Sequence, residues 1–245
     1  MCYLCGRYEI GIMKKVLSFI VFLMLCSMGT TVHAQDEVEA TLEADVVSQF
    51  IWRGLDNGHV SLQPTFGIAW KGLSVSAWGN VGITDSKDAT EIDLELSYTI
   101  GGLTLRVTDY WTDDNPKYFD YHTDTTAHYF EGGVGYDFGV LSLSWQTIFA
   151  GCDLQETSGK RAFSSYAEVV VPFNLATCQW EATVGAVPFK SDFYSTNGFR
   201  VTNLSLKATK DLQISEKFAL PLFGQLVANP NARKMFFVFG LTIGI

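Results

Sequence analysis

The chain has 245 residues and a formal net charge of −9, with 26 acidic against 17 basic side chains. An acidic chain of this kind is poorly suited to the phosphate backbone of a nucleic acid, so no nucleic-acid partner is expected. Hydrophobic residues make up 47% of the sequence. Beyond the N-terminal region, however, no apolar stretch approaches the roughly 18 residues that a membrane-spanning helix needs.

The N-terminal region predicts a secretory signal peptide over residues 1–34. Two lysines precede an apolar run at residues 16–25, and small residues lead to Ala34. A basic segment, a short apolar core and small residues before the cleavage point are the three parts of such a signal. We expect cleavage after Ala34, with residues 1–12 an upstream start that translation does not use. Residues 35–245 then form a single domain.

The rest of the chain alternates between apolar and polar residues, which is the period of a β-strand with two unlike faces. The stretch GLSVSAWGNVGI at residues 72–83 shows this clearly, although Trp78 stands among the polar positions. Most such segments have the 9 to 11 residues that a tilted strand needs to cross a bilayer. Twelve strands are predicted in chain order, at residues 38–52, 60–70, 73–84, 90–100, 103–112, 126–137, 140–150, 162–173, 178–188, 200–210, 217–228 and 234–245.

The connections between these segments alternate in length. Tight turns are expected at residues 71–72, at 101–102 and around Gly139. Longer polar loops follow the third, fifth, seventh and ninth strands, with the sequences DSKDA, DDNPKYFDYHTDT, GCDLQETSGKR and FKSDFYSTNG. Short periplasmic turns and long extracellular loops are typical of outer-membrane barrels. Because backbone groups in a bilayer must be satisfied internally, the strands must close on themselves. The predicted fold is all-β, a closed antiparallel up-and-down transmembrane β-barrel of 12 strands.

Residues 46–82 resemble the N-terminal region of the TorF-type porin family. In that family a strand ends in an element with an aromatic residue before Arg-Gly, a loop follows, and a hairpin then presents a tryptophan-glycine pair. The matching positions here are Trp52, Arg53, Gly54, Trp78 and Gly79. The resemblance implies an outer-membrane barrel with the character of a channel, and it brings no catalytic residues with it.

The parity of the strands places an acidic set of side chains in the barrel interior, where charged groups set the ion preference of a channel. The predicted function is therefore a porin-like outer-membrane channel for passive diffusion of small hydrophilic solutes or ions, with a preference for cations. The lumen-lining candidates are Glu39, Glu43, Asp45, Arg53, Glu91, Asp93, Glu95, Arg106, Glu131, Glu168, Glu181 and Lys207.

Expected partners are outer-membrane lipid and lipopolysaccharide of a Gram-negative cell envelope, small solutes, and the barrel-assembly machinery. The last strand, MFFVFGLTIGI, resembles the C-terminal strand that this machinery recognises, although its final residue, Ile245, is not aromatic as is usual.

The sequence is compatible with two other functions. In one, Arg53 and Arg106 cross-link the interior carboxylates, and the filled barrel has a structural or adhesive role. In the other, the protein is an outer-membrane lipid hydrolase, for which His128 near Thr125 and Thr126 is the conceivable site. No familiar hydrolase, phosphate-binding or metalloprotease motif is present. We therefore expect no enzyme activity, no cofactor and no metal, and we interpret the aspartates of DDNPKYFDYHTD as part of a solvated loop.

Overall fold

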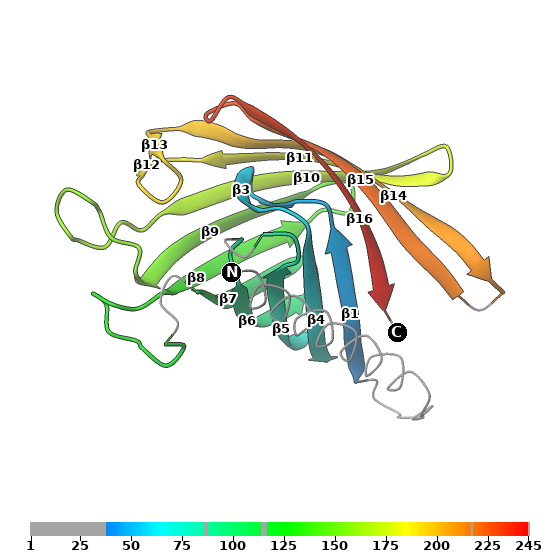
Figure 1. Ribbon diagram of the computed structural model, residues 1–245, viewed down its shortest axis with the longest axis horizontal. Helices are drawn as coiled ribbons and strands as arrows, with labels where there is room; N and C mark the ends of the chain where they lie inside the picture. The colour runs from blue at the N-terminus through cyan, green and yellow to red at the C-terminus, as the bar shows by residue number, and fades with distance from the viewer. Residues whose placement is uncertain (1–37, 86–87, 114–116, 217, 245) are drawn as a thin grey trace, which may run out of the picture. The chain divides into compact units, whose positions relative to one another are not determined.

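The computed structural model describes residues 38–244 except 86–87, 114–116 and 217 (Figure 1). The predicted signal peptide lies outside the described residues. No helix in the described part of the chain is long and apolar enough to cross a membrane.

Twelve strands form a closed barrel in which each strand pairs antiparallel with its neighbours in barrel order, and β1 closes the ring on β16. The predicted all-β class, the closed antiparallel barrel and the number of strands are confirmed. The strands are β1 (Glu39–Val47), β4 (Ser61–Trp70), β5 (Leu73–Gly82), β6 (Glu91–Ile100), β7 (Leu103–Thr112), β8 (His128–Asp137), β9 (Ser142–Gly151), β10 (Ser165–Leu175), β11 (Cys178–Val187), β14 (Arg200–Ser215), β15 (Phe218–Asn229) and β16 (Lys234–Gly244).

The outer face of the barrel is apolar and exposed. On β6 the side chains of Leu94 and Leu96 are 44% and 52% exposed, and the side chain of Glu95 between them points to the other face. Comparable exposed positions occur around the ring, including Phe66, Ile68, Val75, Leu105, Val107, Val134, Leu143, Val184, Leu204, Leu206, Leu226, Phe237 and Phe239. An apolar surface of this kind is unusual for a soluble monomer, because soluble monomers rarely expose large apolar patches.

The two ends of the barrel differ as the sequence predicts. At one end, the turn end, tight connections lie at residues 71–72, 101–102, 138–141 and 176–177. The opposite end, the loop end, carries the longer connections, at residues 48–60, 83–90, 113–127, 152–164 and 188–199. The connection at 188–199 contains the short strands β12 (Lys190–Ser191) and β13 (Thr196–Asn197).

The prediction of one strand over residues 38–52 is wrong in its last part. Strand β1 ends at Val47, and the chain then forms a separate hairpin of β2 (Phe50–Trp52) and β3 (Leu55–Gly58). Arg53 and Gly54 join the two strands with φ angles of 50° and 79°. Two successive positive φ angles are the signature of a type I′ turn, the usual two-residue hairpin connection.

Apolar side chains explain why this hairpin folds into the barrel. Ile51 packs against a buried cluster from the barrel wall, which consists of Val47, Phe223 and Val238. Trp52 and Leu55 pack against a second cluster, Tyr166, Val187 and Tyr194. Phe50 lies against Trp78, with ring centroids 5.4 Å apart. The apolar Trp78 at an inward position is therefore a contact for the hairpin.

The hairpin tip fits closely against the wall, which gives a test of its position. A Cβ atom on Gly54 would lie 1.9 Å from the carbonyl oxygen of Thr202. Gly139 has a similar φ of 81°, and nothing lies within 4 Å of its virtual Cβ. Both alanine variants acquire the same backbone strain, on the order of 1 kcal/mol, but Gly54→Ala must also displace the tip. We expect Gly54→Ala to cost about 1–3 kcal/mol more in free energy of unfolding than Gly139→Ala, as measured by denaturant titration. Equal losses in the two variants would contradict the packing of the tip.

Candidate functional site

An ion pair fixes the tip of the hairpin inside the barrel. The two terminal nitrogens of Arg53 donate to the two carboxylate oxygens of Glu131 on β8, at 2.6 and 2.7 Å. The side chains are only 11% and 2% exposed. Two parallel bonds to one carboxylate are the strongest geometry available to a guanidinium group. Arg53 also donates to the hydroxyl of Tyr194 at 2.7 Å.

Aromatic side chains enclose this pair. The guanidinium carbon of Arg53 lies 4.2 Å from the ring centroid of Trp52 and 4.7 Å from that of Tyr166 on β10. Both distances suit cation–π attraction, which is strongest away from water. The hydroxyl of Tyr110 on β7 donates to Glu131 at 3.0 Å. The hairpin therefore reaches from its roots at β1 and β4 to strands on other sides of the ring.

Two cavities share this part of the interior. The acidic chamber has a volume of about 410 Å³, and the loop-side chamber has a volume of about 270 Å³. Trp52, Glu91 and Tyr110 line both cavities. The rings of Trp52 and Tyr110 meet edge to face with centroids 5.6 Å apart. These three residues therefore form the partition between the chambers.

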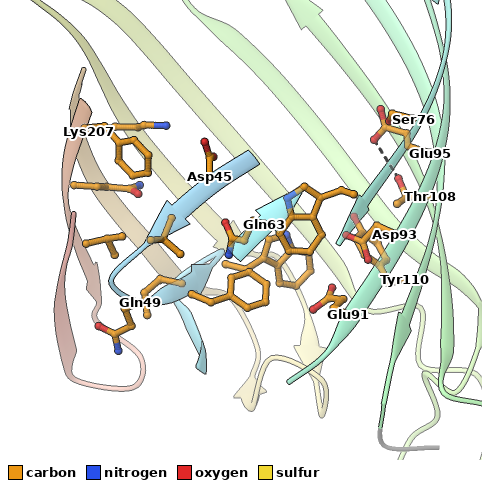
Figure 2. Close-up of a pocket in the computed structure, with 18 residues that line it drawn as sticks. Asp45, Gln49, Gln63, Ser76, Glu91, Asp93, Glu95, Thr108, Tyr110 and Lys207 are labelled. Atoms are coloured by element: carbon orange, nitrogen blue, oxygen red, sulfur yellow. Dashed lines mark hydrogen bonds between the residues drawn. The ribbon is translucent and has the colours of Figure 1, made fainter. Parts of the chain in front are cut away.

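Acidic groups predominate among the ionisable side chains of the acidic chamber. Four carboxyl groups line it, from Asp45, Glu91, Asp93 and Glu95, against one ammonium group, from Lys207. Figure 2 shows Lys207 and the three β6 carboxyl groups on opposite sides of the chamber. The Nζ atom of Lys207 lies 4.4 Å from the ring centroid of Phe223. The β6 side of the chamber is therefore lined by three carboxyl groups, with Lys207 on the other side.

Two of these carboxyl groups have limited contacts with the wall. Thr108 donates to Glu95 at 3.3 Å, and Arg106 lies 3.9 Å from the same group. The Oδ1 atom of Asp93 is buried and has no hydrogen-bond partner among the described residues. A buried acceptor without a partner is costly in a folded protein unless a solvent molecule or ligand serves it.

The other predicted lumen residues are spread over the barrel. Arg106 and Glu168 line a third cavity of about 230 Å³ near the turn end, and Tyr166 donates to Glu168 at 2.6 Å. Glu181 is exposed and stands opposite Lys207 in the pairing of β11 with β14. The remaining two, Glu39 and Glu43, lie on β1 on the same parity as Asp45. Arg53 is the exception, because it reaches the interior from the hairpin and does not belong to the barrel wall.

Sequence reasoning missed the aromatic part of the interior. Trp78 carried a signal, since it is the one large apolar residue at a polar position of its segment. Tyr110 also occupies an inward position, where the sequence alone does not indicate which residues a tyrosine contacts. Phe193 and Tyr194 lie in the connection between β12 and β13, where no periodicity indicates a direction.

His128, the histidine named above for a hydrolase, is held in place by other groups. His128 is fully buried; its Nδ1 atom lies 2.7 Å from Asp109 Oδ1, and its Nε2 atom lies 2.5 Å from the carbonyl oxygen of Tyr118. Both ring nitrogens are therefore occupied, and neither is bonded to a hydroxyl group that it could activate. Tyr118 and Tyr121 pack on the same imidazole ring. Residues 118–121 of the predicted loop thus fold back over His128.

Similarity to known proteins is weak. No family model matches the chain, and none of the curated proteins matches it. Among solved structures, the NanC porin in a rhombohedral crystal form aligns over 84% of this chain and 98% of its own, with a TM-score of 0.42 and 11% sequence identity. A similarity at this level carries no information about what the chain does. The TorF-type resemblance of residues 46–82 stays a prediction.

The ion pair of the hairpin tip gives a second test. Glu131→Gln leaves the Arg53 guanidinium buried without a counter-charge, and we expect a loss of about 3–5 kcal/mol in the free energy of unfolding. Glu181→Gln, at an exposed inward position, should change it by less than about 0.5 kcal/mol. Replacing both partners, as Arg53→Met with Glu131→Gln, should recover part of the loss. Chemical denaturation of the refolded variants measures all three. A Glu131→Gln protein as stable as the parent would contradict the role of the pair.

Proposed function

We propose that the protein is a porin-like channel of the outer membrane, through which small hydrophilic solutes or ions diffuse passively, with a preference for cations. One observation carries the proposal: an acidic chamber of about 410 Å³ lies inside a closed barrel. Interior carboxylates attract cations and repel anions by their local potential.

The exposed surface supports the membrane location. Large apolar side chains such as Leu94, Phe149 and Phe239 are 44–49% exposed on the outer face. Contact with hydrocarbon removes the cost of exposing them to water, and the closed ring leaves no strand edge unpaired in lipid. A Gram-negative outer membrane, reached through a signal peptide and the barrel-assembly machinery, is the compartment for such a barrel.

The partition between the chambers supports a limit on solute size. A solute that passes from the loop-side chamber to the acidic chamber must move past Trp52, Tyr110 and Glu91. Trp52 belongs to the hairpin and Tyr110 to the wall, so the width of this point depends on the position of the hairpin. Ions and small polar molecules are the solutes that we propose.

A structural or surface-recognition barrel is the second candidate. The two interior arginines each lie near a carboxyl group, Arg53 at 2.6 Å from Glu131 and Arg106 at 3.9 Å from Glu95. Cross-links of this kind fill an interior and stiffen it. The acidic chamber lies beside them and favours the channel. The two candidates differ in whether the refolded protein conducts ions.

The carboxyl groups of β6 should determine ion preference. In planar bilayers, across a salt gradient, the refolded protein should pass potassium more readily than chloride, and this preference should weaken at high salt as screening grows. The triple variant Glu91→Gln, Asp93→Asn, Glu95→Gln should move the reversal potential toward zero. The control, Glu39→Gln with Glu181→Gln, changes carboxyl groups that do not line the acidic chamber and should leave the potential near the parent value. An absence of conductance, or a conductance indifferent to the triple change, would support the filled barrel.

The outer face gives an independent test of membrane insertion. Leu94→Arg places a charge against hydrocarbon and should destabilise the barrel in lipid vesicles by roughly 2–4 kcal/mol if the residue lies near the bilayer midplane. The control, Ser76→Arg, places the same side chain in the acidic chamber, opposite Glu95 in the β5–β6 pairing. Urea titration should rank Leu94→Arg as the less stable variant. The reverse order would show that the apolar face does not meet lipid.

A further inference from the structure

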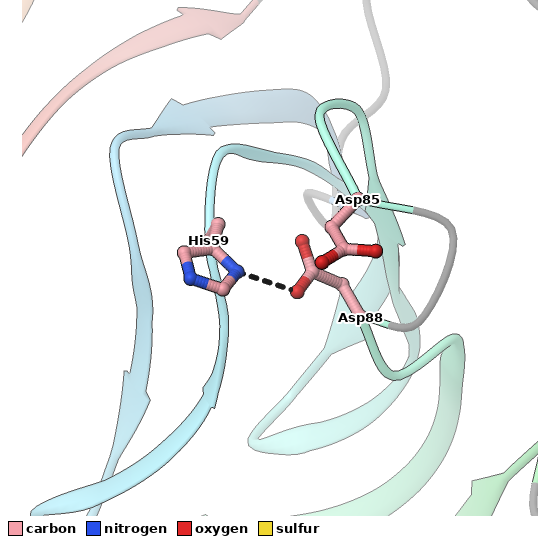
Figure 3. A group of neighbouring side chains, drawn as sticks. All are labelled: His59, Asp85 and Asp88. Carbon is pink, nitrogen blue, oxygen red and sulfur yellow. Dashed lines mark hydrogen bonds and ion pairs between the residues drawn. The ribbon is translucent and has the colours of Figure 1, made fainter.

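A cluster of three side chains lies at the loop end of the barrel, apart from the chambers. His59 lies between β3 and β4, and Asp85 and Asp88 lie in the connection between β5 and β6 (Figure 3). Each residue offers one ligand atom, and these three atoms lie within 4.8 Å of one another. Two segments that are separate in the sequence therefore bring an imidazole and two carboxyl groups together.

Asp88 is the buried member of the cluster. Its side chain is 5% exposed, and its Oδ1 atom lies 2.8 Å from Nδ1 of His59. Its Oδ2 atom is buried and has no hydrogen-bond partner within the described part of the chain. A carboxylate oxygen in this state costs free energy, because it has lost water and gained nothing in exchange. A positively charged ligand bound at this oxygen would offset that cost.

Two glycines make room for this carboxyl group. A Cβ atom on Gly58 would lie 3.1 Å from the Asp88 side chain, and one on Gly82 would lie 2.6 Å from it. Any larger residue at either position would press on Asp88. The backbone on both sides is therefore shaped around a buried carboxyl group next to an imidazole.

We propose that His59, Asp85 and Asp88 bind a divalent transition-metal ion of the zinc type. One imidazole with two carboxylates is a ligand set that suits zinc, whereas magnesium and calcium favour oxygen ligands alone. Ligand bonds of about 2.0–2.2 Å place ligand atoms about 3.4 Å apart in a tetrahedron. The 2.8 Å contact between His59 and Asp88 must therefore open slightly, which is easy for a His59 side chain that is 68% exposed. Water completes the coordination.

The proposed ion would join the root of the hairpin to the β5–β6 connection. His59 follows directly on β3, which ends at Gly58. This site does not depend on the proposed channel function, and a barrel that conducts no ions could still bind zinc here.

Calorimetric titration of the refolded full chain with zinc chloride tests the proposal. We expect one zinc equivalent to depend on the cluster, and His59→Ala and Asp88→Asn each to weaken its binding by at least about tenfold. His122→Ala is the matched control, since His122 is an exposed histidine in the 113–127 connection, and it should bind zinc as the parent does. An excess of magnesium should leave the zinc isotherm unchanged.

Three results would overturn the proposal. They are an absence of zinc uptake by the parent, a His59→Ala isotherm equal to that of the parent, and equal losses in His59→Ala and His122→Ala. Far-UV circular dichroism of each variant identifies a folding failure. Because His59 is exposed, its alanine variant keeps the test decisive even if Asp88→Asn does not fold.

Discussion

The arrangement of the interior depends on the pairing of one buried guanidinium group, that of Arg53, with a carboxylate of opposite charge. Burying an unpaired charge costs several kcal/mol, so Arg53 must remain beside Glu131 once the tip is inside. This pair holds the β2–β3 hairpin across the lumen, places Trp52 against Tyr110, and so creates the partition between the two chambers. Together with the apolar contacts of Ile51, Trp52 and Leu55, the pair keeps the hairpin inside the barrel and the interior divided.

Strand positions and the orientation of their side chains could be predicted from the sequence because both follow from local rules. Side chains alternate across a strand, so the order Ile92, Asp93, Leu94, Glu95 assigns two residues to each face without knowledge of any neighbour. The same rule placed Glu91, Asp93 and Glu95 in the chamber that they line. It also predicted Arg53 as an inward residue from the parity of the first strand, which was predicted over residues 38–52 as part of the wall.

The hairpin and the aromatic contacts could not be predicted in this way, because their partners are remote. Gly54 indicates a turn, but only the contact of its carbonyl with Asn229 Nδ2 at 3.0 Å shows where that turn lies. Tyr194 lies in an irregular connection, and its hydroxyl binds Arg53, 141 positions earlier. The His59 cluster has the same character, since neither DNGHV nor TDSKDA resembles a metal motif alone. Contacts between loops leave no period in a sequence.

The chain order of the hairpin has a consequence for how the molecule is built. The hairpin follows the first barrel strand, but the partners of its tip come from β8, β10, the β12–β13 connection and β15. Contacts between remote segments form late, because the chain between them must first be organised. The apolar side chains of the hairpin can therefore be covered only when these later segments are present. Burial of the hairpin tip depends on strands up to β15, so the interior of the barrel is completed only with most of its wall.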